Sequence, residues 1–256
     1  MVSTATTTTT VADAVDQAVA SLDVDRLGRE YWEQNEFVLI PQFLPREFVE
    51  ATLVPQAQGV KHRLNRNYIP GHKKGGSVSY YTVQEHAPLF LDLYRSPAFL
   101  TFLGRLTDAK LMLCPENDPH SCALYYYTEA GDHIGFHYDT SYYKGARYTI
   151  LMGLVDRSTE CKLVCELFKG VPGKTPQMLE LVTRPGDMVI FNGDKLWHAV
   201  TPLGAGEERI ALTMEYVTNP EMGSFKRLYS NLKDSFAYFG IRGVFKRAFS
   251  SPSKGR

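Results

Sequence analysis

The stretch that decides the fold runs from Pro185 to His198 and has the sequence PGDMVIFNGDKLWH. It contains two turn signals, Pro-Gly-Asp and Asn-Gly-Asp, on either side of the apolar run Met188–Phe191, which has the length of a buried strand. A further strand opens at Trp197. The same alternation of short β-rich runs and turns fills the chain from about residue 110 onward. Such spacing is typical of a sandwich or barrel, so this region is predicted to form a β-barrel or jelly-roll core.

The predicted core consists of several short strands. They are separated by turn signals rich in Gly, Pro, Asn and Asp. The β-rich runs are Leu111–Cys114, Cys122–Tyr127, His133–Tyr138, Tyr148–Val155, Lys162–Phe168, Met178–Val182, Met188–Phe191, Ala199–Pro202 and Arg209–Val217.

The remainder of the chain is predicted to be mainly helical. Two features interrupt the helices before the core: a short buried strand at Phe37–Ile40, and a long loop from Leu64 to Val78 that is rich in Asn, Pro, Gly and Lys. The expected organisation is a threonine-rich, disordered tail (1–10), then one domain (11–256) made of a helical part (11–109), the jelly-roll core (110–218) and C-terminal helices (219–256).

The composition excludes several classes of protein. The formal net charge is zero, with 28 Lys and Arg against 28 Asp and Glu, so no basic surplus indicates a nucleic-acid partner. The four cysteines show no C-x-x-C spacing and are expected to be reduced, buried thiols. No window holds about 18 continuous apolar residues, and the first residues lack the pattern of a secretory signal. We therefore expect a cytoplasmic protein without a membrane segment.

His137 and Asp139 lie at the end of a predicted strand, where alternation places both side chains on the same face. An imidazole and a carboxylate on one face can bind the same metal ion. The pair alone is a weak signal, since roughly one His-x-acid triplet is expected by chance in a chain with seven histidines.

The downstream context strengthens the metal hypothesis. His198 follows the second turn of the deciding stretch, and Arg209 lies on the next strand. Two histidines and one carboxylate on a β scaffold form the facial triad typical of non-haem iron(II), which leaves three coordination positions open. An arginine inside the same barrel can form a bidentate pair with a carboxylate.

The order His137-x-Asp139, then His198 after a Pro-Gly-Asp turn, then Arg209, resembles the iron(II)/2-oxoglutarate-dependent oxygenase superfamily over residues 122–217. The resemblance implies a mainly β fold with flanking α-helices around a double-stranded β-helix, which is a cupin-like jelly roll. It implies that His137, Asp139 and His198 bind Fe(II). It also implies that Arg209 holds the distal carboxylate of 2-oxoglutarate, with O₂ as co-substrate.

Two longer segments are similar to a narrower family, the bacterial enzymes that halogenate or hydroxylate free amino acids such as lysine without a carrier protein. The segments are residues 74–81, KGGSVSYY, and residues 135–143, GFHYDTSYY. In the halogenating members a glycine replaces the carboxylate ligand, and chloride takes the vacant position. Asp139 occupies that position here, which implies the hydroxylating branch.

The strand that carries Arg209 gives a further prediction. If Arg209 faces the barrel interior, every second residue up to Glu215 faces it too, and the intervening apolar residues from Ile210 to Tyr216 form an outer face beneath the helices. Glu215 is then a buried acid that needs a partner. That partner is either an ammonium group of the substrate or a lysine or arginine of the chain.

Other residues are candidates for cofactor or substrate contacts, although each also has an ordinary explanation in a turn, a solvated loop or core packing. Thr213 and Tyr125 are predicted to contact 2-oxoglutarate. Trp197 adjoins a ligand and is predicted to support the metal site. Lys73 and Lys74 in the long loop are predicted to clamp the substrate carboxylate or to act as a lid. The predicted substrate contacts are Glu116, Lys74, His133, Thr140, Glu215 and Tyr127.

These features favour a dioxygenase that hydroxylates an unactivated C–H bond of a free amino acid. The expected amino acid is a cationic one such as lysine. One alternative is an oxygenase that acts on another small metabolite or on a peptide. A radical halogenase, which Asp139 disfavours, and a non-catalytic metal-binding barrel are two more. No carrier protein, nucleic acid or membrane is expected as a partner, and the oligomeric state stays open.

Overall fold

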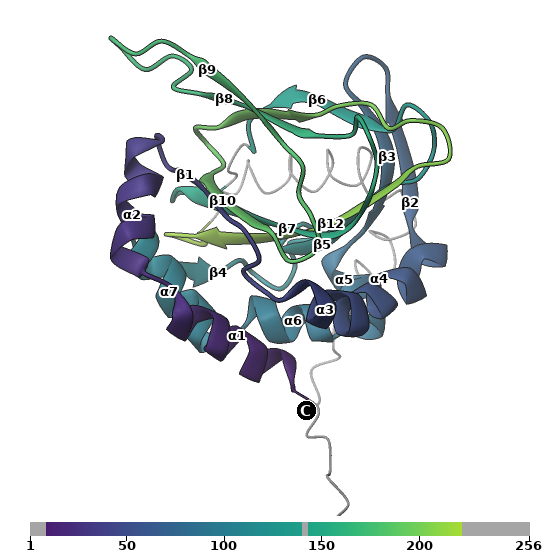
Figure 1. Ribbon diagram of the computed structural model, residues 1–256, viewed down its shortest axis with the longest axis horizontal. Helices are drawn as coiled ribbons and strands as arrows, with labels where there is room; N and C mark the ends of the chain where they lie inside the picture. The colour runs from purple at the N-terminus through teal and green to yellow at the C-terminus, as the bar shows by residue number, and fades with distance from the viewer. Residues whose placement is uncertain (1–8, 140–142, 222–256) are drawn as a thin grey trace, which may run out of the picture.

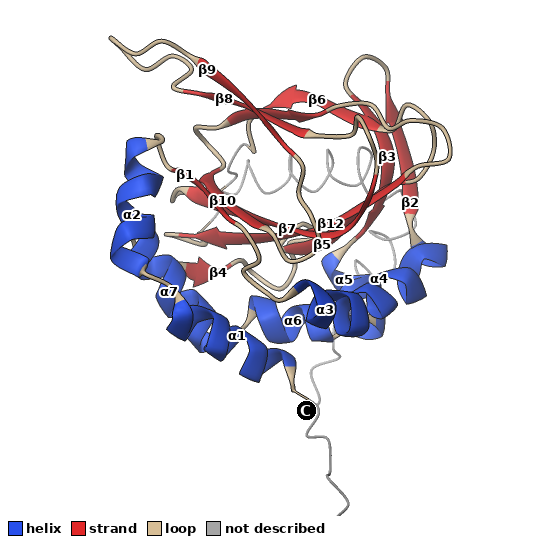
Figure 2. Ribbon diagram, viewed as in Figure 1, coloured by secondary structure: helices blue, strands red, loops and turns tan. Residues whose placement is uncertain are grey.

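A computed structural model of the chain describes residues 9–139 and 143–221 (Figure 1). Within these ranges one antiparallel β-sheet curls into two facing layers, and helices pack against the outside of one layer (Figure 2). The expected disordered tail, apart from residues 9 and 10, and the helices expected beyond residue 221 lie outside the described residues. No helix of the described part is long and apolar enough to cross a bilayer.

The strands are short and connected by tight turns, as predicted. All nine predicted core strands are present with boundaries within two residues, and the strand predicted at Phe37–Ile40 is also found. The strands are β1 (Phe37–Ile40), β2 (Asn65–Ile69), β3 (Lys73–Val78), β4 (Met112–Leu113), β5 (Cys122–Tyr127), β6 (His133–His137), β7 (Arg147–Arg157), β8 (Leu163–Leu167), β9 (Gln177–Leu181), β10 (Met188–Asn192), β11 (Trp197–Val200) and β12 (Glu208–Val217).

The sheet order is β1-β10-β7-β12-β5-β3-β6-β11-β8-β9, with β2 paired to β3 and β4 paired to β12. The strands from β1 to β5 in this order form the layer beneath the helices, and those from β6 to β9 form the facing layer (Figure 1). β3 joins the two layers, since it pairs with β5 on one side and with β6 on the other. The predicted jelly-roll core with flanking helices is confirmed.

The helices begin where the sequence supplies caps. The hydroxyl of Thr10 accepts the N–H of Asp13, Asp23 accepts the N–H of Arg26, and Ser96 caps the helix that starts at Pro97. The helices are α1 (Val11–Ser21), α2 (Val24–Glu33), α3 (Arg46–Phe48), α4 (Val54–Val60), α5 (Tyr80–His86), α6 (Leu89–Tyr94) and α7 (Pro97–Thr107), with a π-helical turn at Val49–Leu53 and a 3₁₀ turn at Lys61–Arg63.

The predicted long loop from Leu64 to Val78 is wrong, because this segment is the β2–β3 hairpin. Its polar composition misled the prediction: β2 is an edge strand whose side chains are mostly exposed, so it carries no apolar alternation. Gly71 forms the turn with a φ of 71°. Gly76 lets β3 pass close to Leu64, since a Cβ there would lie 2.9 Å from the Leu64 Cδ1.

The layer beneath the helices has two apolar faces. The outer face of β12 carries Ile210, Leu212, Met214 and Tyr216, which are fully buried in one cluster with the helices, as predicted. Tyr216, for example, lies 5.1 Å from the Tyr94 ring of α6. The inner face belongs to a second cluster that fills part of the space between the layers. All four cysteines are free and buried, as predicted.

Candidate active site

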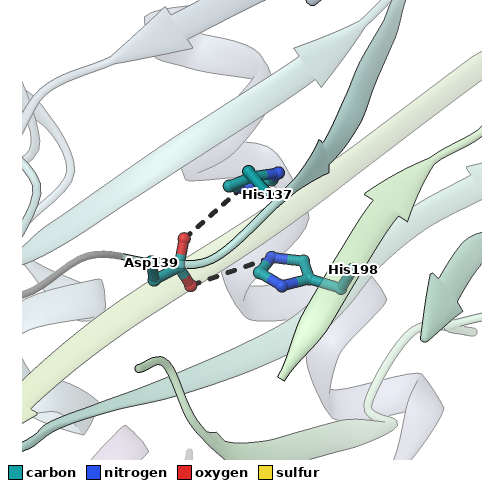
Figure 3. A group of neighbouring side chains, drawn as sticks. All are labelled: His137, Asp139 and His198. Carbon is teal, nitrogen blue, oxygen red and sulfur yellow. Dashed lines mark ion pairs between the residues drawn. The ribbon is translucent and has the colours of Figure 1, made fainter. Parts of the chain in front are cut away.

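Three potential metal ligands meet between the two layers (Figure 3). His137 ends β6 and lies directly opposite His198 of the paired strand β11, and Asp139 follows β6 by two residues. The Nε2 of His137 lies 3.4 Å from the Oδ1 of Asp139, and the Nε2 of His198 lies 3.8 Å from its Oδ2. The three ligand atoms lie within 4.8 Å of one another. This spacing suits a single ion bound on one face.

Backbone carbonyls orient both imidazoles. The Nδ1 of His137 lies 2.8 Å from the carbonyl oxygen of Gly135, and the Nδ1 of His198 lies 3.1 Å from that of Leu196. Because a carbonyl oxygen only accepts hydrogen bonds, each Nδ1 carries the proton, and each Nε2 keeps its lone pair for a metal. Burial also lowers the pKa of His198, which favours the neutral form that a metal ligand requires.

Asp139 is held as a carboxylate. Burial alone would raise its pKa, but interactions with His198 and His137 in their protonated forms, and with the positive charge of Arg147, hold the pKa of Asp139 well below its usual range. Its backbone N–H donates to the carbonyl oxygen of Gly193 at 2.9 Å. The hydroxyl of Thr149 donates to its Oδ2 at 2.8 Å. A charged carboxylate beside two imidazole lone pairs is a suitable donor set for ferrous iron.

Arg209 lies at one end of the same pocket and is 1% exposed. Its Nη2 donates to the hydroxyl of Thr183 at 3.0 Å, and its guanidinium lies 5.1 Å from the ring centre of Tyr127. Its Nε and Nη1 have no hydrogen-bond partner among the described residues. A buried guanidinium with two unused donors is costly, unless an anion binds to it. The unused donors therefore fit the distal carboxylate of 2-oxoglutarate.

The opposite end of the pocket carries charges of both signs. The Nε of Arg147 donates to the Oε2 of Glu215 at 2.8 Å, and the hydroxyl of Thr149 lies 3.0 Å from the same oxygen. The sequence left two possible partners for Glu215, a substrate ammonium group or a lysine or arginine of the chain. In the structure the partner is Arg147. Burial raises the pKa of Glu215 to about 7, against the opposing effect of Arg147. Sequence reasoning missed Arg147 because the predicted strand started one residue later, at Tyr148.

The pocket gathers most of the residues predicted for the metal and cofactor. It is lined by the three potential ligands and Arg209, and by Tyr125, Tyr127, Thr213 and Glu215 from the candidate set. It also includes the polar residues Arg147, Thr149 and His120. Thr183, which contacts Arg209, lies in an irregular segment where no sequence pattern singled it out.

Tyr127, rather than Tyr125, packs against Arg209. Tyr125 lies two positions earlier on β5, where its hydroxyl is 3.5 Å from the Nδ1 of His120. Thr213 is four positions beyond Arg209 on β12, about 13 Å along the strand, and its hydroxyl donates to the carbonyl oxygen of Ala123. Tyr125 and Thr213 therefore lie nearer the mixed-charge end than the Arg209 end.

Several other candidates do not line the pocket. Glu116 has a side chain that is 83% exposed and lies 3.7 Å from the Nη2 of Arg95. Trp197 points to the outer face of its strand, where its ring packs on Phe136 and Tyr138. Thr140 lies outside the described residues.

His133 is excluded from the pocket by a β-bulge. His137 pairs with His198 and Ile134 pairs with Val200, so three steps along β6 match two along β11. The extra residue reverses the alternation, and Ile134 lines the pocket in place of His133. The isolated Gly135 within β6 is the one local signal of this bulge.

Strand alternation separates the two lysines of β3. Lys74 faces outward and its Nζ donates to the carbonyl oxygen of Ala130 at 2.7 Å. Lys73 faces inward, is 1% exposed, and lies with its Nζ 5.1 Å from the ring centre of Tyr125. Lys73, and not Lys74, is therefore the lysine that lies beside the pocket.

The buried Lys73 predicts a pH-dependent stability. Burial lowers the pKa of Lys73 to about 7, below that of an unfolded lysine, so from about pH 7 upward the unfolded chain binds more protons. This term stabilises the folded chain as pH rises. Relative to Lys73→Met, the wild type should gain roughly 1–2 kcal/mol between about pH 7 and about pH 8.5, measured by urea unfolding. Lys74→Met is the matched control. A pH-independent difference for Lys73→Met would contradict the prediction.

No protein-family model matches the chain, and no curated protein sequence matches it. Solved structures do match. The non-haem α-ketoglutarate-dependent carbocyclase SnoK from nogalamycin biosynthesis is 16% identical, with a TM-score of 0.63 over 82% of this chain and 92% of that chain. The epimerase SnoN, in complex with Fe³⁺, α-ketoglutarate and nogalamycin RO, is 15% identical, with a TM-score of 0.62 over 91% of this chain and 93% of that chain.

A prolyl hydroxylase from Trichoplax adhaerens, in complex with a peptide fragment of hypoxia inducible factor, is 15% identical, with a TM-score of 0.59 over 81% of this chain and 94% of that chain. All three proteins are far from this chain in sequence. The likeness therefore establishes the architecture: this chain has the jelly-roll fold that these iron- and 2-oxoglutarate-dependent enzymes share.

Proposed function

We propose that this protein is an iron(II)- and 2-oxoglutarate-dependent dioxygenase that hydroxylates an unactivated C–H bond of a free cationic amino acid such as lysine. One observation carries the first half of the proposal. The cluster of His137, Asp139 and His198 shares a pocket with Arg209, which is buried with two unused donors. A barrel that only binds a metal gains nothing from such an arginine, because an unpaired buried charge lowers stability.

The chain's residues have separate tasks in this proposal. His137, Asp139 and His198 would hold the iron, and Arg209, oriented by Thr183, would hold the distal carboxylate of 2-oxoglutarate. When bound, iron and 2-oxoglutarate would supply the oxidation, in which O₂, 2-oxoglutarate and the substrate are converted to succinate, CO₂ and the hydroxylated substrate, with one oxygen atom in succinate and one in the new hydroxyl group. Apolar residues of the pocket wall would exclude water around both groups; they are Leu151, Leu163, Phe191, Val200 and Ala211.

The end of the pocket that carries Arg147 and Glu215 supports the proposal of a zwitterionic substrate. Glu215 lies six positions beyond Arg209, about 20 Å along β12, so one molecule of 2-oxoglutarate leaves this end free for a second molecule. Arg147 and Glu215 line it, and Lys73 lies beside it. A free cationic amino acid carries both a carboxylate and ammonium groups, which complement such a set. A residue within a peptide has neither terminal charge.

The proposal is tested with purified protein, Fe(II), ascorbate and 2-oxoglutarate, and with a panel of free amino acids headed by lysine, ornithine and arginine. Lysine should stimulate succinate formation and gain the mass of one oxygen atom. Norleucine lacks the side-chain ammonium and cadaverine lacks the carboxylate. Each should be turned over at least about 10-fold less efficiently, since each leaves a charged group of the pocket without its partner.

Two outcomes would contradict the proposal at different levels. If no amine, amino acid or peptide stimulates succinate formation, the small-molecule hydroxylase is wrong. If norleucine and cadaverine perform as well as lysine, the oxygenase stands but the recognition of a zwitterion does not. A chlorinated product would favour the halogenase alternative, which Asp139 opposes because it fills the coordination position that a halide would need.

A further inference from the structure

The hydroxyl of Thr149 lies between two carboxylates. Thr149 is 2% exposed and sits on β7, directly opposite Glu215 of β12. Its Oγ1 lies 2.8 Å from the Oδ2 of Asp139 and 3.0 Å from the Oε2 of Glu215. A hydroxyl carries one proton, so it can donate to only one of these oxygens at a time.

Arg147 decides which carboxylate receives that proton. Its Nε already donates to the Oε2 of Glu215 at 2.8 Å, so this oxygen has a charged donor without Thr149. Among residues 9–139 and 143–221, no lysine or arginine forms an ion pair with the Oδ2 of Asp139, and the Nε2 of His198 lies 3.8 Å from it. The shorter of the two Thr149 distances is also the one to Asp139. The hydroxyl proton therefore serves Asp139.

Gly193 confines Asp139 from another side. Its carbonyl oxygen accepts the N–H of Asp139, and its own N–H donates to the carbonyl oxygen of Arg147. A Cβ at Gly193 would lie 2.9 Å from the Cβ of Asp139 and 3.0 Å from the Oγ1 of Thr149. There is no room for a side chain here. Thr149 and Gly193 together thus leave the Asp139 carboxylate one orientation.

We infer that Thr149 is a positioning residue for the metal ligand Asp139: its hydroxyl holds Oδ2 and so keeps Oδ1, which faces the Nε2 of His137, available to the ion. Arg147 supports this arrangement by donating to Glu215, which leaves the hydroxyl proton to Asp139. The inference rests on the proposed function, because it assumes that Asp139 binds a metal. Groups that orient metal ligands typically contribute 10–100-fold to metal affinity.

The test compares Thr149→Val, which keeps the shape but removes the hydroxyl, with Thr149→Ser, which keeps the hydroxyl. The probe is cobalt(II), titrated calorimetrically into the metal-free chain without 2-oxoglutarate. Thr149→Val should bind cobalt(II) about 10-fold more weakly than the wild type, and Thr149→Ser should bind it within about 3-fold of the wild type. The melting temperature of each metal-free variant is measured in parallel, because a purely structural role would lower it without this pattern in affinity.

A second variant keeps the test decisive if Thr149→Val does not fold. Gly193→Ala retains every hydrogen-bonding group but displaces Asp139 and Thr149, so it should also weaken cobalt(II) binding. Unchanged affinity in Thr149→Val, or equal losses in Thr149→Val and Thr149→Ser, would overturn the inference. Asp139→Ala separates this failure from that of the proposed function: if the wild type binds cobalt(II) no better than Asp139→Ala, the metal site itself is wrong.

Discussion

Replacing Asp139 with alanine is expected to abolish hydroxylation and to weaken Fe(II) binding by more than about 100-fold, since even the groups that orient metal ligands contribute 10–100-fold. The substitution removes one of three ligands and leaves two imidazoles, which cannot fix three sites on one face of the ion. Product is measured as the gain of one oxygen atom by mass spectrometry, and bound iron by metal analysis after gel filtration.

The fold of this variant should survive, which makes the result interpretable. Because the folded chain holds the pKa of Asp139 well below its usual range, loss of this carboxylate should lower the melting temperature of the metal-free chain, and binding is therefore measured below that temperature. Asp16→Ala, at an exposed position on α1, is the matched control for loss of a carboxylate. Hydroxylation that continues unchanged in Asp139→Ala would mean that the iron ligands are misassigned.

Replacing Arg209 with methionine should raise the concentration of 2-oxoglutarate needed for half-maximal succinate formation by about 30-fold or more. Loss of one partner from a buried, hydrogen-bonded charge pair costs about 2 kcal/mol or more, which corresponds to this factor. Binding of cobalt(II) should be unaltered, because Arg209 touches none of the three ligands. A raised 2-oxoglutarate requirement with unaltered cobalt(II) affinity would distinguish the role of Arg209 in cofactor binding from a role in metal binding.

The same variant should make the protein without cofactors more stable. Arg209 is buried with two donors that lack a hydrogen-bond partner among the described residues, and an apolar side chain removes that cost. The melting temperature of metal-free Arg209→Met should therefore rise, whereas the further rise that 2-oxoglutarate gives the iron-loaded wild type should disappear. Arg157→Met, with a side chain that is 75% exposed on the neighbouring strand, is the control. An unaltered 2-oxoglutarate requirement would remove Arg209 from the site.

Much of the fold could be predicted because strand alternation and turn residues act locally. The outer face of β12 from Ile210 to Tyr216 packs beneath the helices as expected, since burial of that apolar stripe leaves only one possible orientation for the strand. The same alternation correctly turned Glu215 inward. The metal cluster followed from residue type and strand position for the same reason.

The parts that could not be predicted depend on long-range pairing. β2 is polar because it is an exposed edge, and only its pairing with β3 makes it a strand. The bulge in β6, which removes His133 from the pocket, exists because of the register with β11. Thr183 reaches Arg209 from a segment without regular structure. Local patterns do not fix any of these contacts, since each depends on a partner that is distant in the chain.

The ion pair between Arg147 and Glu215 constrains how this pocket can evolve. Loss of either partner alone leaves a buried charge at a cost of about 3–5 kcal/mol, a large share of the stability of an ordinary domain. Selection should therefore remove single substitutions at these positions, whereas joint replacement by apolar residues of similar volume should be tolerated. A joint replacement would also remove the charges from this end of the pocket. The charges at this end of the pocket should therefore change in paired steps, and related sequences should covary at positions 147 and 215.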